Sequence, residues 1–583
     1  MKKHFLLALV ALLLGFQVME AIPARPGKII HTQPDGSKIV LLLHGDEFGH
    51  WVTDENGNLL CEDKDGFYRR DFQTDLEAVR RAAAEKRSAR RAYVSQSRSS
   101  RGIAWGQKRF LVILVAFSDL DFTVEEPQQA FTDLLNEAGY SRNGATGSAR
   151  DFYFDNSHGG FEPIFDVYGP VKLTKKYSYY GSNVGQNDSC PEEALIDGCT
   201  ALDDEIDFSR YDNDGDGRVD MVFMYYAGHN EAEGASSNTI WPHQWELSSA
   251  GKSLTLDEVR VDSYACTSEL SGASGNSMCG IGAACHEFGH AMGLPDMYDT
   301  DYATNGEAGG LYAFSTMCDG AYNNDSRTPP YFNFEERMFL GWVSESEYRT
   351  FRKSGTYTID PVSENVAYRT FTDMDGEYFV YEARPKTGWD KYIPAGGLLV
   401  YHVDKSTREV RIGNNWWIPA CELWSNWHQT NSINENGSHP CFYLIPAASQ
   451  SSLHTYSPSR IPFPQQNVTS YRPVSWNDVE GDIRFTNITF ADGIVTLRAN
   501  VPRVDLDYPY IVDAGGYQAG SRFTFELDYP DEVEIPVSVV WYYDDEPAGA
   551  DAVTLTAGTH SVDAYLTYAD GRTAVVTLDI QVK

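Results

Sequence analysis

The sequence predicts a multidomain protein in which a mixed α/β domain is followed by β-sandwich-type domains. Its 583 residues exceed what one hydrophobic core usually organises. Residues 110–117 (FLVILVAF) form an uninterrupted apolar run typical of a fully buried strand, and strand-like and helix-like segments alternate after it. From residue 357 to residue 500 the apolar residues instead recur with period two, which favours an all-β region.

The first residues have the pattern of an export signal. Lys2 and Lys3 precede an uncharged apolar stretch at 5–14, and a cleavage point follows at Ala21. This stretch is too short to anchor the chain in a bilayer, and no later stretch is long and apolar enough. We therefore expect removal of a signal peptide (1–21), no integral membrane segment afterwards, and a secreted or otherwise extracytoplasmic protein, in the periplasm or at the cell surface. A buried N-terminal helix is the competing interpretation.

Residues 22–104 are expected to form a pro-segment with a basic linker. Its first part combines the β-type run 38–43 (KIVLLL) with Asp-Gly and Asn-Gly turns, which predicts a small β-rich unit. Its second part, 75–101, has few large apolar residues and favours a helix and then a flexible linker open to trypsin-like cleavage. A solvated basic helix without a processing role is the alternative. The basic residues of the linker are Arg80, Arg81, Lys86, Arg87, Arg90, Arg91, Arg98 and Arg101.

Three domains follow the pro-segment. The α/β domain is assigned to residues 105–345 and the β-rich domain to residues 346–502. Residues 503–583 contain short strands separated by turns, which favours an immunoglobulin-like β-sandwich.

Charge and cysteine content exclude one class of partner and suggest a redox environment. The formal net charge of −36 argues against nucleic acid, because binding phosphates needs a basic surface. An exported protein can form disulfides, and eight of the nine cysteines follow the linker, an even set that could pair fully. Only Cys61 precedes it.

Residues 281–292 carry the clearest chemical signal. They lack proline and follow a glycine, so they can form a helix on which His286 and His290 point from one face toward one metal ion. Glu287 can then hold a water on the metal and take its proton. A catalytic zinc site needs a third protein ligand. Asp296 can return to the metal after the chain turns at Gly293, although Asp299 lies close by in sequence.

A second group of acidic residues has the spacing of a calcium loop. Four aspartates occupy positions one, three, five and nine, and the carbonyl of Arg218 falls at position seven. Position twelve is Phe223 instead of glutamate, so another segment must complete the shell. An Asp/Gly-rich surface turn is the alternative. The expected Ca²⁺ ligands are Asp212, Asp214, Asp216, Arg218 and Asp220.

Residues 286–299 (HEFGHAMGLPDMYD) resemble the active-site signature of the immune inhibitor A type of secreted bacterial metalloproteases, which are metzincin-like zinc peptidases. The resemblance extends over about residues 105–500 and implies a mixed α/β zincin catalytic domain followed by β-sandwich-type domains. It also implies Asp296 as the third zinc ligand and a methionine turn at Met317, for which an ordinary core methionine is the alternative. It is also carried by 147–153 (GSARDFY), 211–217 (YDNDGDG), 240–243 (IWPH) and 397–404 (GLLVYHVD).

These observations predict a secreted zinc-dependent endopeptidase made as a zymogen, with Zn²⁺ as cofactor, structural Ca²⁺, and protein or peptide substrates. One rival is a catalytically inactive surface binding or adhesin protein on the same fold. It is disfavoured because His286, Glu287, His290 and Asp296 are all present. A second rival is a zinc hydrolase that acts on another kind of bond. For latency, we consider Cys61 as a thiolate that takes the water position on zinc, and steric blocking by the pro-segment as its alternative.

Overall fold

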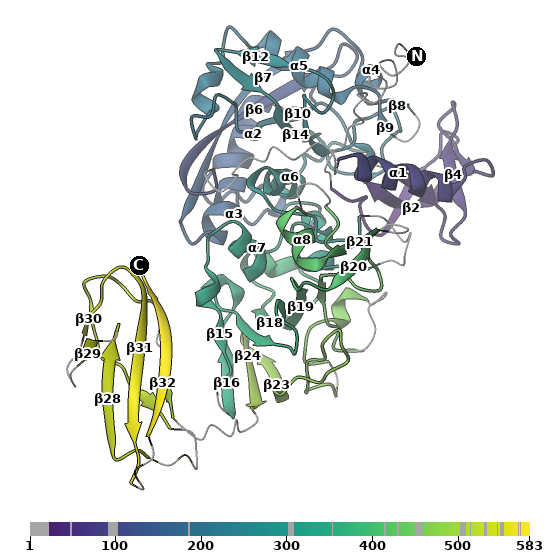
Figure 1. Cartoon of the computed structure of the whole chain (residues 1–583). Coiled ribbons are helices and arrows are strands. Elements are labelled where there is room, and N and C mark those ends of the chain that lie inside the picture. The colour runs from purple at the N-terminus through teal and green to yellow at the C-terminus, as the bar shows by residue number, and fades with distance from the viewer. Residues whose placement is uncertain are drawn as a thin grey trace, which may run out of the picture. The chain divides into compact units, whose positions relative to one another are not determined.

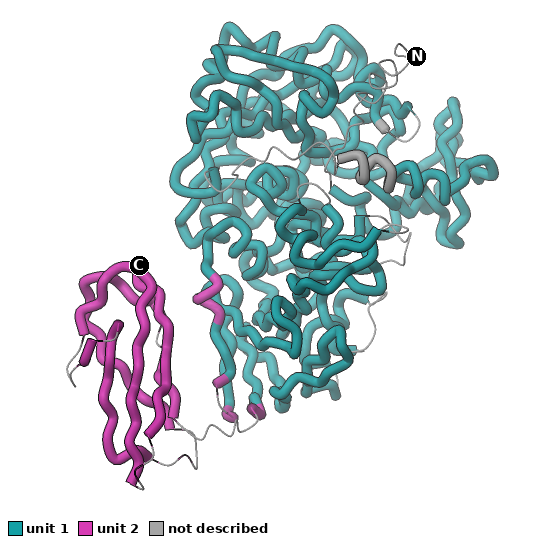
Figure 2. Tube along the Cα trace, viewed as in Figure 1, with its two compact units in different colours: residues 1–344, 349–351, 356–499 teal, residues 345–348, 352–355, 500–583 magenta. Residues whose placement is uncertain are grey.

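The computed structural model forms two compact units, each described here by itself (Figure 1, Figure 2). The larger unit comprises residues 1–344, 349–351 and 356–499, and the smaller unit comprises the rest. No helix among the described residues is long and apolar enough to cross a membrane. The predicted signal peptide and much of the basic linker lie outside the described residues. The structure describes residues 22–583 except 47–48, 91–102, 185–186, 301–307, 353, 413–415, 428–430, 449–456, 466, 502–508, 514, 530–532, 534, 545, 549–552, 570 and 572.

The expected β-rich part of the pro-segment is an antiparallel five-stranded sheet with its strands in chain order. The helix α1 (Leu76–Arg90) follows the sheet and contacts its third strand. The apolar run 38–43 lies in the second strand, and Leu41 is fully buried there. The strands are β1 (Lys28–Thr32), β2 (Lys38–Asp46), β3 (Gly49–Thr53), β4 (Leu59–Glu62) and β5 (Tyr68–Arg70).

A five-stranded sheet in the order β11-β14-β10-β6-β7 forms the centre of the α/β domain. Four strands are parallel to their neighbours, and β11 pairs antiparallel at one edge. The predicted buried strand at 110–117 lies mainly in β6, and its residues are buried because elements cover both faces of a parallel sheet. The strands are β6 (Gly106–Ala116), β7 (Phe161–Lys172), β10 (Val222–Tyr226), β11 (His243–Glu246) and β14 (Ser263–Ser268).

Helices pack against this sheet. Ser148 and Asp151 form a capping box that starts α3. These two residues of the segment 147–153 therefore stabilise the N-terminus of a helix. The helix α6, which carries the histidine pair, contacts β14 and β11. The main helices are α2 (Pro127–Asn136), α3 (Ala149–Asn156), α5 (Pro191–Ala201), α6 (Gly282–Met292) and α7 (Phe334–Phe339).

The β-rich region that follows belongs to the same compact unit as the α/β domain. Trp389 donates from its indole Nε1 to Asp155 at the end of α3, over 2.8 Å. A Cβ on Gly147 would lie 2.8 Å from the Trp389 ring, so this glycine allows the close packing. One sheet contains β15 (Arg349–Thr350), β17 (Tyr368–Phe371), β18 (Glu377–Arg384), β19 (Gly397–Asp404) and β22 (Phe442–Leu444), and the other contains β16 (Gly355–Ile359), β24 (Ile494–Asn500) and β23 (Arg484–Ala491).

The C-terminal unit is all β, as expected, and its immunoglobulin-like topology stays a prediction. A four-stranded antiparallel sheet has the order β29-β28-β31-β32. Two short antiparallel pairs belong to the same unit, β25 (Tyr510–Ile511) with β27 (Leu527–Asp528) and β26 (Arg522–Phe523) with β30 (Val553–Thr554). Phe525, Val562 and Leu566 belong to its hydrophobic core. The strands of the larger sheet are β28 (Ser538–Tyr543), β29 (Glu546–Ala548), β31 (Gly558–Thr567) and β32 (Thr573–Val582).

The cysteines that could pair by their number are unpaired in the structure. All nine cysteines lie in the described part of the chain, and each is a free thiol. Cys199 and Cys266 are buried in the hydrophobic core of the α/β domain, where they pack as small apolar side chains. The even number of cysteines after the linker therefore does not correspond to pairing in this structure.

Candidate metal centre and active site

The helix α6 forms where the sequence predicted it. It starts after Ile281 and ends at Gly293, whose φ of 110° is the left-handed conformation that terminates helices. His286 and His290, one turn apart, therefore lie on the same face, and their ring centroids are 4.7 Å apart. Both side chains are buried, so their ring nitrogens are held away from solvent.

Backbone carbonyls fix which nitrogen of each imidazole carries the proton. The Nδ1 of His286 lies 2.9 Å from the carbonyl oxygen of Thr316, and the Nδ1 of His290 lies 2.8 Å from that of Leu294. A carbonyl can only accept, so each Nδ1 donates and each Nε2 presents a lone pair. Burial lowers the pKa of His286, which favours the neutral form that binds metals.

Asp296 brings a third electron-pair donor to the same point. Its Oδ1 lies 3.2 Å from the Nε2 of His286 and 3.4 Å from the Nε2 of His290, and the two Nε2 atoms are 3.1 Å apart. Three buried lone-pair atoms that face one another would repel without a cation among them.

The spacing of these three atoms fits zinc. Bonds of about 2.0–2.1 Å to a tetrahedral zinc ion place its ligand atoms roughly 3.3 Å apart. Among the described residues, His286, His290 and Asp296 form one of two groups whose ligand atoms lie close enough to share a metal ion. Asp299, the alternative third ligand, accepts a hydrogen bond from the backbone of Ala308 over 2.9 Å. The donor set of two imidazoles and one carboxylate is one that zinc commonly takes.

Asn431, from the β-rich region, holds Asp296 in place. Its Nδ2 donates to Asp296 Oδ2 over 2.6 Å, and its Oδ1 accepts from the Asp296 backbone N over 3.0 Å. Its carbonyl accepts from Thr300 over 2.8 Å. The residue is buried and has a φ of 43°, a left-handed conformation that asparagine tolerates better than most residues. The β-rich region therefore contributes directly to the candidate metal centre.

Met317 lies against α6 next to the histidine pair. A Cβ on Gly289 would stand 2.6 Å from the Met317 sulfur, so the glycine lets this side chain reach the helix backbone. Met317 is fully buried, and its carbonyl accepts from the Met297 backbone N over 2.8 Å. Met317 therefore packs against the helix that carries the histidines, and its assignment as a methionine turn stays a prediction.

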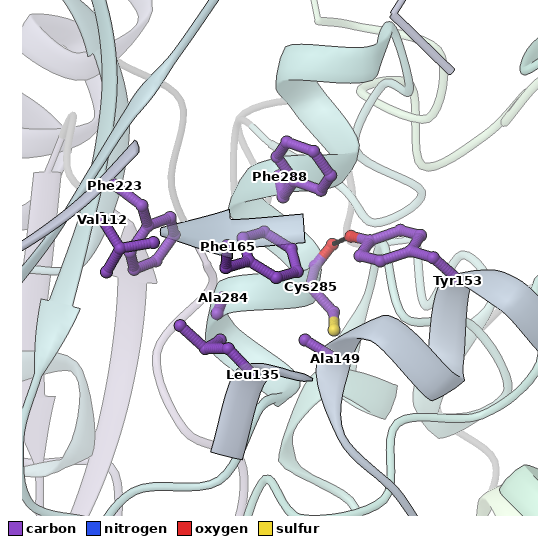
Figure 3. A pocket seen from close by; sticks show the side chains of 9 residues that line it. All are labelled: Val112, Leu135, Ala149, Tyr153, Phe165, Phe223, Ala284, Cys285 and Phe288. Carbon is purple, nitrogen blue, oxygen red and sulfur yellow. Dashed lines mark hydrogen bonds between the residues drawn. The ribbon is translucent and has the colours of Figure 1, made fainter. Parts of the chain in front are cut away.

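A small apolar cavity near α6 is closed by aromatic side chains (Figure 3). Phe288, the residue after the glutamate of the motif, lines it together with Phe165 and Tyr153. The hydroxyl of Tyr153 donates to the carbonyl of Cys285 over 2.8 Å, which is the hydrogen bond drawn in Figure 3. These contacts fix the helix that carries the histidines.

Glu287 is buried and contacts the first described residue of the chain. The backbone N of Ile22 donates to Glu287 Oε1 over 2.8 Å. Ile22 is 1% exposed and packs in one cluster with Trp241, Ala283 and Tyr322. The candidate general base and the first residue after the predicted signal peptide therefore meet.

The residues after Ile22 also form hydrogen bonds with the α/β domain. The Trp241 indole donates to the carbonyl of Ile22 over 3.2 Å, and the Tyr322 hydroxyl donates to the carbonyl of Pro23 over 2.7 Å. The backbone N of Arg25 donates to the carbonyl of Ala232 over 2.9 Å. These bonds reach only backbone atoms of the segment, as contacts of a protease with a substrate chain do.

Cys61 has no described contact with the metal centre. It is exposed on β4, and partial burial together with Asp71 and Asp63 raises the pKa of its thiol. This shift disfavours the thiolate that the latency hypothesis required. The structure instead places Ile22 at Glu287.

The predicted calcium loop is partly assembled. Asp212, Asp214 and Asp216 form the second group of close carboxylates, and two of the three are exposed. Asp220 instead accepts hydrogen bonds from Asn213, over 3.0 Å from the backbone N and 2.6 Å from the side chain. The guanidinium of Arg218 pairs with Asp262. The atom of Arg218 expected to bind calcium is its backbone carbonyl oxygen, which this ion pair does not involve.

Sequence reasoning missed the roles of Ile22, Trp241 and Asn431. Trp241 stands in the family-like segment 240–243, which was the only available signal for it. The contacts of Ile22 and Asn431 join residues 265 and 135 positions apart, respectively, and no local pattern marks such contacts.

The part of the chain that contains the candidate metal centre is similar to a known peptidase family. Residues 104–340 match the family model described as immune inhibitor A peptidase M6, catalytic domain. The predicted resemblance is confirmed for this domain. Immune inhibitor A of Bacillus thuringiensis subsp. alesti is 23% identical over 271 residues, which are 40% of this chain and 39% of that protein. The pre-pro-metalloprotease PrtV of Vibrio cholerae serotype O1 is 25% identical over 278 residues, which are 40% of this chain and 30% of that protein.

These M6 relatives suggest a metalloprotease and do not favour the adhesin alternative. The alignments span less than half of the length of each relative. A solved structure of catalytically inactive OgpA from Akkermansia muciniphila with an O-glycopeptide substrate covers 84% of this chain and 96% of its own, at 9% identity and a TM-score of 0.23. A likeness this low carries no argument about the fold.

Proposed function

We propose that this chain is a secreted zinc-dependent endopeptidase made as a zymogen. The observation that carries the proposal is the meeting of two imidazole Nε2 atoms and a carboxylate oxygen within 3.4 Å of one another beside a buried glutamate. His286, His290 and Asp296 are the proposed zinc ligands. A zinc ion bound there would polarise the scissile carbonyl and lower the pKa of a bound water.

The protein's own groups then carry the proton. Glu287, next in sequence to His286 on α6, takes the proton of the attacking water and returns it to the leaving amine. Burial of Glu287 keeps its carboxylate out of bulk solvent. The interaction of the carboxylate with the attacking water is stronger in this low-dielectric environment than it would be in bulk solvent. Thr316 and Leu294 keep both imidazoles in the tautomer that presents Nε2.

The decisive experiment replaces Glu287 by Ala in the processed protein. General-base catalysis contributes about 10²–10⁴-fold, so hydrolysis of an unfolded protein substrate should fall by at least about 100-fold. Zinc content and the melting temperature should stay close to those of the wild type, because a base is lost and not a ligand. Activity above about 1% of the wild type would sink the assignment.

The contacts of residues 22–25 support latency through a blocked cleft. After cleavage at Ala21, the amino group of Ile22 would be a free α-ammonium placed against the Glu287 carboxylate. There it occupies the base and the space that a substrate needs. Cleavage in the basic linker would then release the segment and activate the enzyme.

Two zymogen variants separate the latency devices. Deleting residues 22–25 should give activity without cleavage of the linker, provided that the melting temperature shows a folded protein. Cys61→Ser should stay as latent as the wild type, because its thiol is exposed on β4. Full latency of the deletion variant together with an active Cys61→Ser variant would reverse this proposal.

We also propose a structural Ca²⁺ at Asp212, Asp214 and Asp216, whose carboxylates lie together in the loop before β10. Oxygen ligands from several carboxylates are the kind that Ca²⁺ takes. The carbonyl of Arg218 and the side chain of Asp220 remain candidate further ligands.

A further inference from the structure

The pro-segment places one positive side chain in an acidic niche. The Arg25 guanidinium lies 3.0 Å from a carboxylate oxygen of Glu233 and 2.6 Å from one of Asp325. Although burial alone would lower it, these two carboxylates hold the pKa of Arg25 above its usual value. The two acidic residues come from separate segments, 92 positions apart, so the fold assembles the niche.

Glu233 is fixed in this niche by groups of the α/β domain itself. The backbone N of Gly272 donates to Glu233 Oε2 over 2.8 Å, and the Asn230 side chain donates to Oε1 over 3.2 Å. The Glu233 side chain is 8% exposed with Arg25 in place. These hydrogen bonds do not depend on the pro-segment, so the carboxylate keeps its position when the pro-segment leaves. Departure of Arg25 removes its cationic partner, so the fixed carboxylate is available to pair with another cation.

The niche lies within reach of the catalytic centre along one extended chain. Ile22 contacts Glu287, and Arg25 is three residues further on, which is at most about 10 Å of extended backbone. Between these two points the carbonyls of Ile22 and Pro23 accept hydrogen bonds from Trp241 and Tyr322. The α/β domain therefore binds the segment through its backbone, with the amino end of the segment at the candidate base.

We infer that Glu233 and Asp325 form a subsite for a lysine or arginine side chain of the substrate, which Arg25 fills in the zymogen. This inference rests on the proposed function. In that reaction Glu287 returns a proton to the leaving amine, so the amine at Glu287 corresponds to the residue that follows the scissile bond. Arg25 then marks the fourth residue after that bond. The formal net charge of −36 also favours the approach of basic peptides.

The test uses the linker-processed full chain and synthetic peptides with the sequence of residues 22–27 (IPARPG) as inhibitors. Inhibition constants are measured for this peptide and for analogues with glutamine or glutamate in place of the arginine. We expect the glutamine analogue to inhibit roughly 10-fold more weakly, because one ion pair of the niche is largely buried. The glutamate analogue should be weaker still.

Asp325→Arg provides the sharper variant, because Asp325 is half-exposed. The change also removes the ion pair of Asp325 with Arg327 over 3.0 Å and places arginine at a φ of 51°, so the melting temperature of the variant is measured first to show that it is folded. It should weaken the arginine peptide and strengthen the glutamate analogue, which reverses their order. Asp579→Arg makes the same charge change on an exposed position of the C-terminal unit and should leave the order unchanged. A substrate library should show a preference for lysine or arginine at the fourth residue after the cleaved bond, and Asp325→Arg should abolish it.

The outcomes are distinct. Equal inhibition by the three peptides, or an unchanged order in the Asp325→Arg variant, would overturn the subsite while leaving the peptidase proposal intact. Failure of the processed wild type to cleave any protein substrate would instead overturn the proposed function.

Discussion

Asn431 is the most informative residue to change at the metal centre, because it belongs to the β-rich region and touches the proposed ligand Asp296. The best substitution is Asn431→Gly. It removes both side-chain hydrogen bonds to Asp296, and glycine adopts the φ of 43° without the strain that alanine would add.

The expected loss of zinc affinity follows from these contacts. Groups that orient metal ligands typically contribute 10–100-fold to metal affinity, which is about 1.4–2.7 kcal/mol. The bond from Asn431 Nδ2 to Asp296 Oδ2 is short, at 2.6 Å, buried and made to a charged acceptor. We therefore expect a loss near the upper end of this range. The Asn431→Asp variant should bind zinc still less well at neutral pH. It places a second carboxylate against Asp296, and the repulsion between the two carboxylates displaces the proposed ligand.

The assay is competition for zinc between the processed protein and a chromophoric chelator. Asn434→Gly is the matched control, because Asn434 donates to the carbonyl of Met297 over 3.0 Å and accepts from the backbone of Phe442 but touches no proposed ligand side chain. It should lower the melting temperature and change the zinc affinity by less than about threefold. Wild-type affinity in Asn431→Gly, or an equal loss in Asn434→Gly, would refute the positioning role.

Three further changes test other parts of the structure. His290→Ala should lose zinc from the folded protein, and an unchanged zinc content per chain would mean that α6 is not the metal site. Adding Ca²⁺ to protein that has been freed of calcium and reloaded with zinc should raise the melting temperature by roughly 5–10 °C when the Ca²⁺ concentration is about 100 times the dissociation constant. Asp214→Asn should remove most of this rise. A melting temperature indifferent to Ca²⁺ would exclude the loop as a structural site. Burial raises the pKa of Glu336 from 4.5 to about 7, so the folded state binds this proton more tightly than the unfolded state. The free energy of unfolding should therefore fall by up to about 3 kcal/mol as pH rises from about 4.5 to 7, and it should level off above pH 7. Glu336→Gln should therefore gain melting temperature relative to the wild type as pH rises through this window, and a difference that is independent of pH would contradict the shift.

The sequence alone determined the local features of this protein. The spacing of His286 and His290, the glutamate between them and the glycine that ends the helix are short-range patterns, because helical geometry places residues four apart on one face. The buried strand β6 was predicted because an uninterrupted apolar run is typical of a strand covered on both faces, and the β-rich region was predicted because its apolar residues recur with period two. Strand β18 of that region is nevertheless buried along its whole length, which the alternation did not indicate.

Tertiary structure alone decided which distant groups meet at the site. Asn431 reaches Asp296 across 135 positions, and Ile22 reaches Glu287 across 265 positions, because packed elements bring backbone and side-chain atoms together in ways that no periodicity records. The same reason explains why the number of cysteines does not decide whether they pair. Their number suggested pairing, but a disulfide needs two cysteines whose Cβ atoms face each other at short range, and the fold leaves all nine as free thiols.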